Sequence, residues 1–310
     1  MYNKRIVFLG TPKFAATILQ GLIDNKYNVV GVVSQPDKLV GKKKQLTITP
    51  VKQVALENNI EVYQPVKLKD DYNFLINLKP DLLITCAYGQ ILPQSVLDIA
   101  TINNINVHAS LLPTLRGGAP IHRAIINGDT KTGVTIMQMI DKMDAGVMYS
   151  KKEVEIDIDI NTTQLFDKLQ YVGRDLLIET LPSIIDKSNP GIPQDESEVT
   201  YAFNIKREEE KLEFNKSALE VHNLIRGLSE APGAYCYLND KSFKIYKSKI
   251  SNIKNDNEDI GTLKVINKKL YVSCKDYYLE LLNIQIEGKK AMDSVSFLNG
   301  NKNVDGLKLE

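Results

Sequence analysis

The first half of the chain alternates short apolar runs with segments that have helical spacing. Arg5–Leu9 is an apolar run with β-branched residues, and it ends at a turn signal, Gly10-Thr11-Pro12. After it, Phe14, Ile18 and Leu22 stand four residues apart, which is the spacing of one face of an amphipathic helix. Further apolar runs predict strands over Asn28–Ser34, Asp81–Thr85, Ile105–Val107 and Val134–Met139. Thr49-Pro50 predicts an N-cap followed by proline in the first turn of a helix. Strands separated by helices predict an α/β fold with a doubly wound, Rossmann-like parallel sheet.

The pattern changes after a long helix that is expected to end near Ile185. Residues 187–197 are polar and rich in Pro and Gly, which predicts a linker. Beyond it the sequence predicts one helix and then closely spaced short strands: Ser217–Gly227, followed by Gly233–Leu238, Phe243–Lys249, Gly261–Ile266, Lys269–Cys274 and Tyr278–Gln285. Such strands favour a small β-barrel of the oligonucleotide-binding (OB) type. We therefore predict an α/β domain over residues 1–188, a linker over 189–207 and an OB-like barrel over 208–310.

Composition narrows the class of protein. The 310 residues include 39 Lys and Arg and 38 Asp and Glu, so the whole chain has no strong basic field. Residues 208–310 carry 16 basic and 16 acidic side chains, so any RNA contact there must use a local face. The three cysteines are far apart and lack C-x-x-C spacing, which predicts apolar fillers in a reducing compartment. With no signal-peptide pattern and no apolar run of membrane-spanning length, a soluble cytoplasmic protein is expected.

Only one of the three histidines stands where chemistry is expected. Ligands of doubly wound sheets bind beyond the carboxyl ends of the strands, and His108 directly follows the predicted strand Ile105–Val107. Asn106 lies two residues earlier, so its side chain points to the same face in extended backbone. An amide donor beside an imidazole suits the stabilisation of an oxyanion. The alternative is a strand-end histidine that satisfies a backbone carbonyl, while His122 and His222 lie in helical patterns and are expected to be structural.

Two loops near this strand contain further candidates. Ser110–Pro113 and then Arg116–Pro120 form a tight loop in which two glycines let the backbone approach a ligand, unless it is an ordinary connection to a helix that begins at Ala119-Pro120. The segment Asp141–Gly146 follows the predicted strand Val134–Met139, and its Asp144 could reach the same crevice. A carboxylate there can orient an imidazole and help to move a proton. A solvated turn aspartate is the alternative.

Together these residues resemble a known family. Asn106-Val-His108-Ala-Ser-Leu-Leu-Pro113 with Asp144 is similar to the signature of the 10-formyltetrahydrofolate-dependent formyltransferases. The resemblance implies that Asn106, His108 and Asp144 form the catalytic trio. It also implies a folate site, with 10-formyltetrahydrofolate as the formyl donor and no metal, made by Ser110, Leu111, Leu112 and Pro113, and by the backbone of Met139, Ile140, Asp141, Lys142, Met143 and Asp144.

Three other segments resemble those family members that formylate methionyl-tRNA. They are Phe8–Phe14, the stretch from Gln35-Pro-Asp37 through Thr49-Pro-Val-Lys52, and Gly288–Met292. This resemblance covers nearly the whole chain and implies that the acceptor is the α-amine of methionyl initiator tRNA. The product would be N-formylmethionyl-tRNA for translation initiation, made by a monomer with no obligate protein partner. The loop residues expected to contact tRNA are Lys38, Lys42, Lys43 and Lys44.

Two departures from the family pattern are visible. The tRNA loop often carries arginine, whereas lysines stand here, which keeps the charge but loses the bidentate fork. Without the resemblance, the lysine run would be interpreted as a solvated surface loop. Val147 stands where the family commonly has an acidic residue, and this position lies outside the trio.

Three alternative functions follow from parts of the pattern. A sugar-nucleotide formyltransferase would share the trio, but the lysine-bearing loop and Gly288–Met292 argue against it. A second alternative is a non-catalytic module that binds RNA or folate, but the intact trio argues against it because such a module would not need these three residues. Dinucleotide binding is disfavoured because Gly10–Phe14 lacks the G-x-G-x-x-G pattern.

Overall fold

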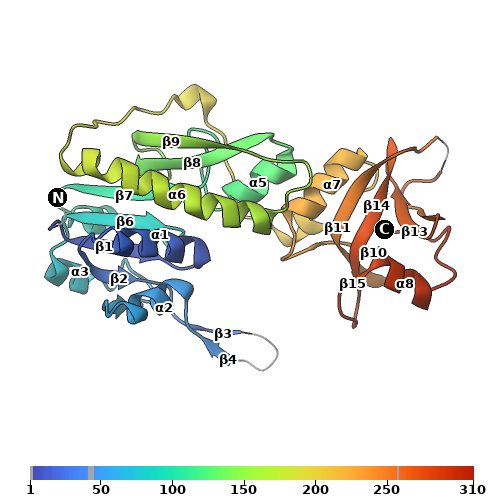
Figure 1. Ribbon diagram of the computed structural model, residues 1–310, viewed down its shortest axis with the longest axis horizontal. Helices are drawn as coiled ribbons and strands as arrows, with labels where there is room; N and C mark the ends of the chain where they lie inside the picture. The colour runs from blue at the N-terminus through green and yellow to red at the C-terminus, as the bar shows by residue number, and fades with distance from the viewer. Residues whose placement is uncertain (1–2, 41–44, 257) are drawn as a thin grey trace. The chain divides into compact units, whose positions relative to one another are not determined.

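The computed structural model describes residues 3–40, 45–256 and 258–310, and the chain folds as two compact units (Figure 1). The first unit comprises Met1–Pro120, Thr132–Glu155 and Phe166–Phe203, and the second comprises Ile121–Lys131, Ile156–Leu165 and Asn204–Glu310. Residues 189–203, predicted as the first part of a linker, therefore make their contacts within the first unit. The domain limits predicted near residues 188 and 208 stay a prediction.

The first unit is built on a seven-stranded sheet with the order β5-β2-β1-β6-β7-β8-β9. Its strands are β1 Ile6–Gly10, β2 Val29–Val33, β5 Val62–Tyr63, β6 Leu82–Cys86, β7 Asn103–His108, β8 Lys131–Gln138 and β9 Met148–Glu155. The pairs from β5 to β7 are parallel, which confirms the predicted Rossmann-like sheet. At the other edge β8 runs antiparallel to β7, and the polar strand β9, which the sequence pattern did not predict, lies next to β8.

Helices cover both faces of this sheet, as a doubly wound fold requires. They are α1 Lys13–Asp24, α2 Pro50–Glu57, α3 Asn73–Leu78, α4 Gln94–Leu97 and α6 Thr162–Ile185. On one face α1 and α6 lie side by side (Figure 1), with the rings of Phe14 and Phe166 edge to face at 6.3 Å. On the other face, a buried cluster joins the sheet to α3 and α4 and includes Val7, Leu9, Val33, Leu75, Leu83 and Val96. Burial of each such side chain contributes about 1.5–3 kcal/mol before the entropy cost of ordering it.

A short hairpin projects between β2 and α2 and was not predicted. It consists of β3 Lys38–Val40 and β4 Gln45–Thr47, which pair antiparallel. Directly after it, the Thr49 hydroxyl accepts a hydrogen bond from the Lys52 N–H and Pro50 is the first residue of α2. This confirms the predicted N-cap, because the side-chain oxygen satisfies one of the free N–H groups at the start of the helix.

The second unit contains a six-stranded antiparallel sheet with the order β10-β11-β14-β13-β12, and β15 pairs with β14. Its elements are α5 Pro120–Asn127, which counts with this unit from Ile121, α7 Ala218–Gly227, β10 Ala234–Leu238, β11 Lys241–Lys254, β12 Leu263–Ile266, β13 Lys269–Ser273, β14 Tyr277–Ile286, β15 Met292–Asp293 and α8 Ser294–Gly300. Two short 3₁₀ turns, Glu196–Glu198 in the first unit and Arg207–Glu210 in the second, complete the structure. The helix predicted over Ser217–Gly227 is found as α7, and Ser217 is its N-cap.

The end of the chain closes this sheet into the predicted barrel. Leu309 forms a bridge with Leu238 of β10, and Lys308 forms one with Thr262 beside β12, so both sheet edges meet the same segment. The interior is filled from every strand and from α7 and α8, with Phe243, Ile245, Leu279 and Phe297 at its centre. All three cysteines are free and buried, and no helix in the described ranges has the length and apolar character needed to cross a membrane.

Candidate active site

Strand β7 presents the first two members of the predicted trio at its carboxyl end. Asn106 and His108 alternate with Val107, so both point to the same side of the sheet. His108 is the last residue of the strand and is 5% exposed. Two polar side chains thus lie beside each other at the sheet edge where ligands of this fold class bind.

The amide of Asn106 is held in one orientation by the neighbouring strand. The hydroxyl of Thr85, on β6, donates to Asn106 Oδ1 at 3.0 Å. The amide nitrogen Nδ2 therefore points away from Thr85 and lies 3.5 Å from Asp144 Oδ1. Thr85 was missed from the sequence, because a threonine inside an apolar strand carries no signal of its own until the strand order is known.

The two ring nitrogens of His108 have different partners. Nε2 lies 3.1 Å from the Leu115 carbonyl, and because a carbonyl only accepts, Nε2 carries a proton. Nδ1 faces Asp144 Oδ2 at 3.8 Å. The alternative interpretation from the sequence, a histidine that satisfies a backbone carbonyl, thus describes one nitrogen only. The other nitrogen faces a carboxylate and has no backbone carbonyl as its partner.

Asp144 is held firmly in the loop between β8 and β9. Its backbone has a φ of +49°, a left-handed conformation that residues other than glycine adopt uncommonly. The Gly117 N–H donates to its Oδ2 at 2.8 Å, and the Gln194 side chain donates to its carbonyl at 2.8 Å. This is not a solvated turn aspartate. The structure brings Asn106, His108 and Asp144 together, and their catalytic roles stay predictions.

The stretch Ser110–Pro113 is more buried than a ligand-lining loop usually is. Ser110 is fully buried and its hydroxyl donates to the Thr114 carbonyl at 2.6 Å. Leu112 is also fully buried and packs with Met137 and Met148. These two side chains face the interior, so any ligand contact from this stretch must come from other groups, such as its backbone.

The loop Met139–Met143 has a different character. Met139 packs partly against the core, while Ile140 and Met143 are 40% and 46% exposed. Within the described part of the chain, the main-chain groups of Ile140, Asp141 and Met143 have no hydrogen-bond partner. Apolar side chains beside free amide groups are the features that hold a flat heterocycle with polar edges.

The predicted tRNA-binding lysines are only partly described. Lys38 lies exposed in β3, and Lys42, Lys43 and Lys44 lie outside the described residues. The base of their loop is closed by Lys52, whose ammonium is 2.6 Å from an Asp37 carboxylate oxygen. Hydrogen bonds from Lys52 and then from Gln64 hold the pKa of Asp37 below its ordinary value. The hairpin thus has a fixed root in the first unit.

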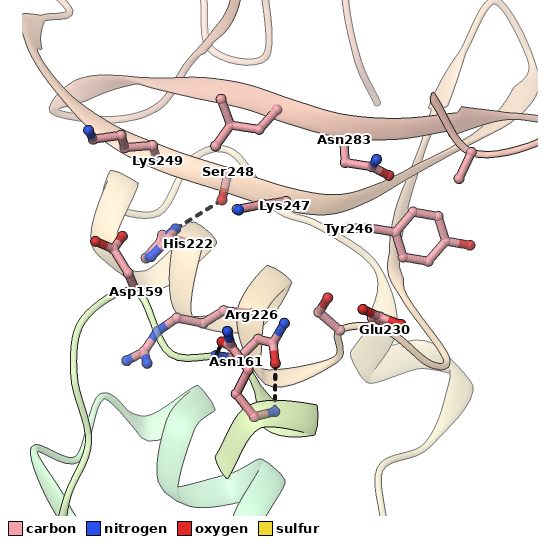
Figure 2. A pocket seen from close by; sticks show the side chains of 14 residues that line it. Asp159, Asn161, His222, Arg226, Glu230, Tyr246, Lys247, Ser248, Lys249 and Asn283 are labelled. Carbon is pink, nitrogen blue, oxygen red and sulfur yellow. Dashed lines mark hydrogen bonds between the residues drawn. The ribbon is translucent and has the colours of Figure 1, made fainter. Parts of the chain in front are cut away.

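The second unit has a pocket of its own, with a volume of about 850 Å³ (Figure 2). Lys247 and Lys249 line it from β11, and Asp159 and Glu230 are among its acidic residues. His222 of α7 also lines the pocket. It is bonded to the Ser248 hydroxyl at 2.9 Å and to a backbone carbonyl at 3.1 Å, and burial lowers its pKa. His222 is therefore structural, as expected, and the exposed cations of the pocket are the lysines.

In the ranges that the structure describes, no cluster of three or more His, Cys, Asp or Glu side chains has the arrangement of a metal site. The trio itself contains one carboxylate and one imidazole beside an amide. Such a set can donate hydrogen bonds to a developing oxyanion and can move a proton.

Comparisons with known proteins match both units. Residues 4–181 match the family model described as formyl transferase, and residues 204–302 match the model described as formyl transferase, C-terminal domain. The methionyl-tRNA formyltransferase of Malacoplasma penetrans is 45% identical over 303 residues, which cover 97% of this chain and 95% of that protein. The methionyl-tRNA formyltransferase of Lactobacillus gasseri is 47% identical over 298 residues, covering 95% of each.

Solved structures share the fold at lower identity. The sugar 3N-formyl transferase WlaRD, crystallised with dTDP and 5-N-formyl-THF, superposes with a TM-score of 0.68 at 20% identity, covering 93% of this chain and 99% of that one. An N-formyltransferase from Helicobacter canadensis, in complex with folinic acid and dTDP-3-aminofucose, gives a TM-score of 0.69 at 18% identity, covering 90% and 98%. At these identities the likeness concerns the fold.

Proposed function

The chain belongs to the formyl transferase family, and from this we propose that it transfers the formyl group of 10-formyltetrahydrofolate to the α-amine of methionyl initiator tRNA. The observation that carries the reaction is the meeting of Asn106, His108 and Asp144 at the end of β7. The acceptor is supported by relatives at 45% and 47% identity over nearly the full chain, which are named methionyl-tRNA formyltransferases. The product, N-formylmethionyl-tRNA, serves translation initiation.

The residues beside the trio fit a folate. Ile140 and Met143 offer exposed apolar surface for the pterin ring, and the free main-chain groups of Ile140, Asp141 and Met143 offer donors and acceptors for its edge. In the stretch Ser110–Pro113, the contribution comes from the backbone and from Leu111, because the side chains of Ser110 and Leu112 are buried. When bound, 10-formyltetrahydrofolate supplies an activated formyl group on a nitrogen leaving group, so no metal is required.

The trio then stabilises charge on the formyl oxygen. As the neutral methionyl amine adds to the formyl carbon, this oxygen becomes negative and needs hydrogen-bond donors. Asn106 Nδ2 provides one, because the Thr85 hydroxyl turns the amide so that this nitrogen points toward the site. His108 provides the other from Nδ1 when that nitrogen is protonated, since Nε2 is occupied by the Leu115 carbonyl. Both donors stand on one strand and need no rearrangement.

Asp144 orients the imidazole and carries the proton. Its Oδ2 faces His108 Nδ1 at 3.8 Å, so the carboxylate can orient the ring. Its Oδ1 lies next to the Asn106 amide, which places the carboxylate among the reacting groups. The carboxylate can therefore accept the proton that the amine loses and deliver it toward the leaving nitrogen.

RNA binding requires both units. Lys38, Lys42, Lys43 and Lys44 attract the acceptor stem, and the Asp37–Lys52 pair anchors their loop. The C-terminal domain that we predict over residues 208–310, behind a linker over 189–207, has no bulk positive field, so it contacts RNA through a local face. Lys247 and Lys249 supply that face, because within the described residues no carboxylate lies within ion-pair distance of either ammonium. The enzyme acts in the cytoplasm as a monomer.

A comparison of acceptors tests the function. Purified protein should formylate methionyl initiator tRNA with 10-formyltetrahydrofolate and should use methionyl elongator tRNA much less well. An amino-sugar nucleotide serves as the third acceptor, because the shared fold would also suit it. Formylation of the sugar nucleotide with none of methionyl-tRNA would overturn the proposed acceptor and leave the chemistry intact.

A further inference from the structure

A fully buried arginine lies directly beside the trio. Arg116 is 0% exposed, although an arginine side chain is almost never fully buried unless it is paired. Its Nε and Nη2 both donate to Gln194 Oε1, at 3.0 and 2.8 Å, and Nη2 also donates to Glu196 at 2.9 Å. Nη1 has no acceptor in the described part of the chain. A buried charge with one nitrogen unpaired is expensive, which suggests a role beyond stability.

Gln194 passes this interaction on to the catalytic loop. Because its Oε1 accepts from Arg116, its Nε2 must point the other way. There it donates to the carbonyls of Asp144 and Gly146, both at 2.8 Å. These two carbonyls belong to the residues on either side of Ala145, in the loop that leads to β9. The amide of Gln194 is thus a bridge from a buried guanidinium to the backbone that carries the Asp144 carboxylate.

Asp144 needs such support because of its backbone conformation. At a φ of +49° it occupies the left-handed region, which a residue with a side chain leaves unless its surroundings hold it. If the loop relaxed, the carboxylate would lose its approach to His108 Nδ1, now 3.8 Å away. An error of about 1 Å in the placement of a catalytic group can cost about 100-fold in rate.

The neighbours of Arg116 in the chain hold the trio as well. The Leu115 carbonyl accepts from His108 Nε2, and the Gly117 N–H donates to Asp144 Oδ2. The Arg116 main chain is itself fixed, because its N–H donates to the Thr200 carbonyl at 2.9 Å and its carbonyl accepts from the Ala202 N–H at 2.7 Å. One short segment therefore sets both the imidazole and the carboxylate.

We propose that Arg116 and Gln194 are positioning residues for formyl transfer, which hold Asp144 in its left-handed conformation so that its carboxylate faces His108. The proposal rests on the proposed function for its kinetic test. It gives a positioning role to the stretch 189–203, which follows α6 and belongs to the first unit.

The test uses shape-conserving variants of Gln194 with a matched control. Gln194→Glu keeps the acceptor for Arg116 but replaces the two donated hydrogen bonds by carboxylate lone pairs facing carbonyls. Gln194→Met removes both functions. The control is Gln170, a buried glutamine of α6 that is bonded to Thr17 and Asp167 and to no member of the trio. Gln194→Glu and Gln194→Met should lower kcat by about 10- to 100-fold with little change in KM, whereas Gln170→Glu and Gln170→Met should lower only Tm.

A double-mutant cycle shows whether Gln194 acts through Asp144. In an Asp144→Asn background, Gln194→Met should cost little further kcat, since the group that it positions is already impaired. An equal loss in both backgrounds would overturn the proposal, and so would Gln194 variants that behave like the Gln170 variants. If the unmodified protein formylates no acceptor, the proposed function fails instead. A crystal structure of Gln194→Met then decides the positioning role alone: Asp144 should leave its positive φ, and an unmoved Asp144 would refute it.

Discussion

The proposed active site of the first unit and the pocket of the second unit both contain polar groups, yet they are built differently. In the proposed active site, each trio residue is held by a named partner: Thr85 for Asn106, Leu115 for His108, Gly117 and Gln194 for Asp144. In the pocket, the buried groups such as His222 are held in this way, but Lys247 and Lys249 are exposed.

This difference predicts two kinds of response to mutation. Hydrogen bonds in a buried site are directional and short, so the loss of one partner misplaces a reacting group and costs a large factor in rate. Attraction between exposed lysines and phosphate is long-ranged, is screened by salt and tolerates small displacements. Variants of the proposed active site should therefore change kcat, whereas variants of the pocket lysines should change KM and its salt dependence.

The largest effect is expected in the trio. His108→Ala removes one of the two proposed donors to the formyl oxygen, and Asp144→Asn removes the carboxylate that is proposed to orient the ring and to carry the proton. Each should lower kcat by about 100- to 1000-fold, measured as formyl transfer to methionyl initiator tRNA. Asp186→Asn, a change at an exposed carboxylate near the end of α6, is the control and should leave kcat unaffected. Activity near the unmodified level in both trio variants would remove the basis of the mechanism.

A smaller loss is expected from Thr85→Val. The variant keeps the shape of the side chain but removes the hydroxyl that turns the Asn106 amide, so kcat should fall about tenfold while KM for folate changes little. Thr180→Val is the matched control, because Thr180 is also a buried threonine with side-chain hydrogen bonds but lies on α6. If both variants lose only Tm, the Thr85 hydroxyl has no part in catalysis.

Reversal of charge in the second unit should act on RNA binding. Lys247→Glu with Lys249→Glu should raise the KM for tRNA several-fold and leave kcat intact. The slope of log KM against log salt concentration should fall by about 0.7 to 0.9 for each RNA phosphate that the variant no longer neutralises. Lys302→Glu, an exposed lysine outside the pocket, serves as the control. Equal salt slopes in all three proteins would exclude this face as an RNA-binding surface.

Loss of the Asp37–Lys52 pair at the base of the lysine loop should raise the KM for tRNA less than loss of the lysine charges does. Asp37→Asn weakens the interaction with Lys52 while keeping the shape of the side chain, so the base of the hairpin loses an ion pair but the lysines are all retained. The KM for tRNA should rise about threefold, which corresponds to under 1 kcal/mol. Asp167→Asn, which removes the exposed pair with Lys13, should not change it. An unchanged KM in Asp37→Asn would show that the loop needs no anchor.

The smallest effect concerns Glu196 and depends on pH. Hydrogen bonds from Arg116 and then from Lys142 lower the pKa of Glu196 from 4.5 to about 2. Because the folded protein holds the carboxylate charged, this interaction stabilises the fold fully above pH 4.5, and the stabilisation disappears as pH falls from 4.5 through about 2. The Tm difference between the unmodified protein and Glu196→Gln should therefore shrink across that window. A difference that is constant with pH would contradict the assignment.

The sequence pattern predicted most of the fold and the trio. Apolar runs and helical spacing located β1, α1, β2, β6 and β7, and the N-cap at Thr49 was placed correctly. Such features depend on local sequence, so they can be recognised without knowing what packs against them. The polar strand β9 was missed because its side chains do not alternate clearly, and it is a strand only because β8 offers a free edge.

The stretch 189–203 shows the limit of composition as a guide. Its two prolines and one glycine predict irregular backbone, and the backbone is irregular apart from one short 3₁₀ turn. Irregular backbone can still pack closely, and here Gln194 bonds the Asp144 loop while Ala202 bonds Arg116. No local pattern signals such pairings, because the partners stand 50 or more residues away in the chain.

The sequence by itself determined which residues we propose for the chemistry. The spacing of Asn106 and His108 on one strand, together with the family signature that includes Asp144, is a property of the chain and needs no coordinates. Tertiary structure alone decided how these residues are held. Thr85 orients the Asn106 amide, the Leu115 carbonyl accepts the proton of His108 Nε2, and Gln194 bonds the left-handed backbone of Asp144. Thr85 lies in a neighbouring strand and Gln194 is distant in the sequence, and only the order of the strands and the path of the chain after α6 bring them to the trio.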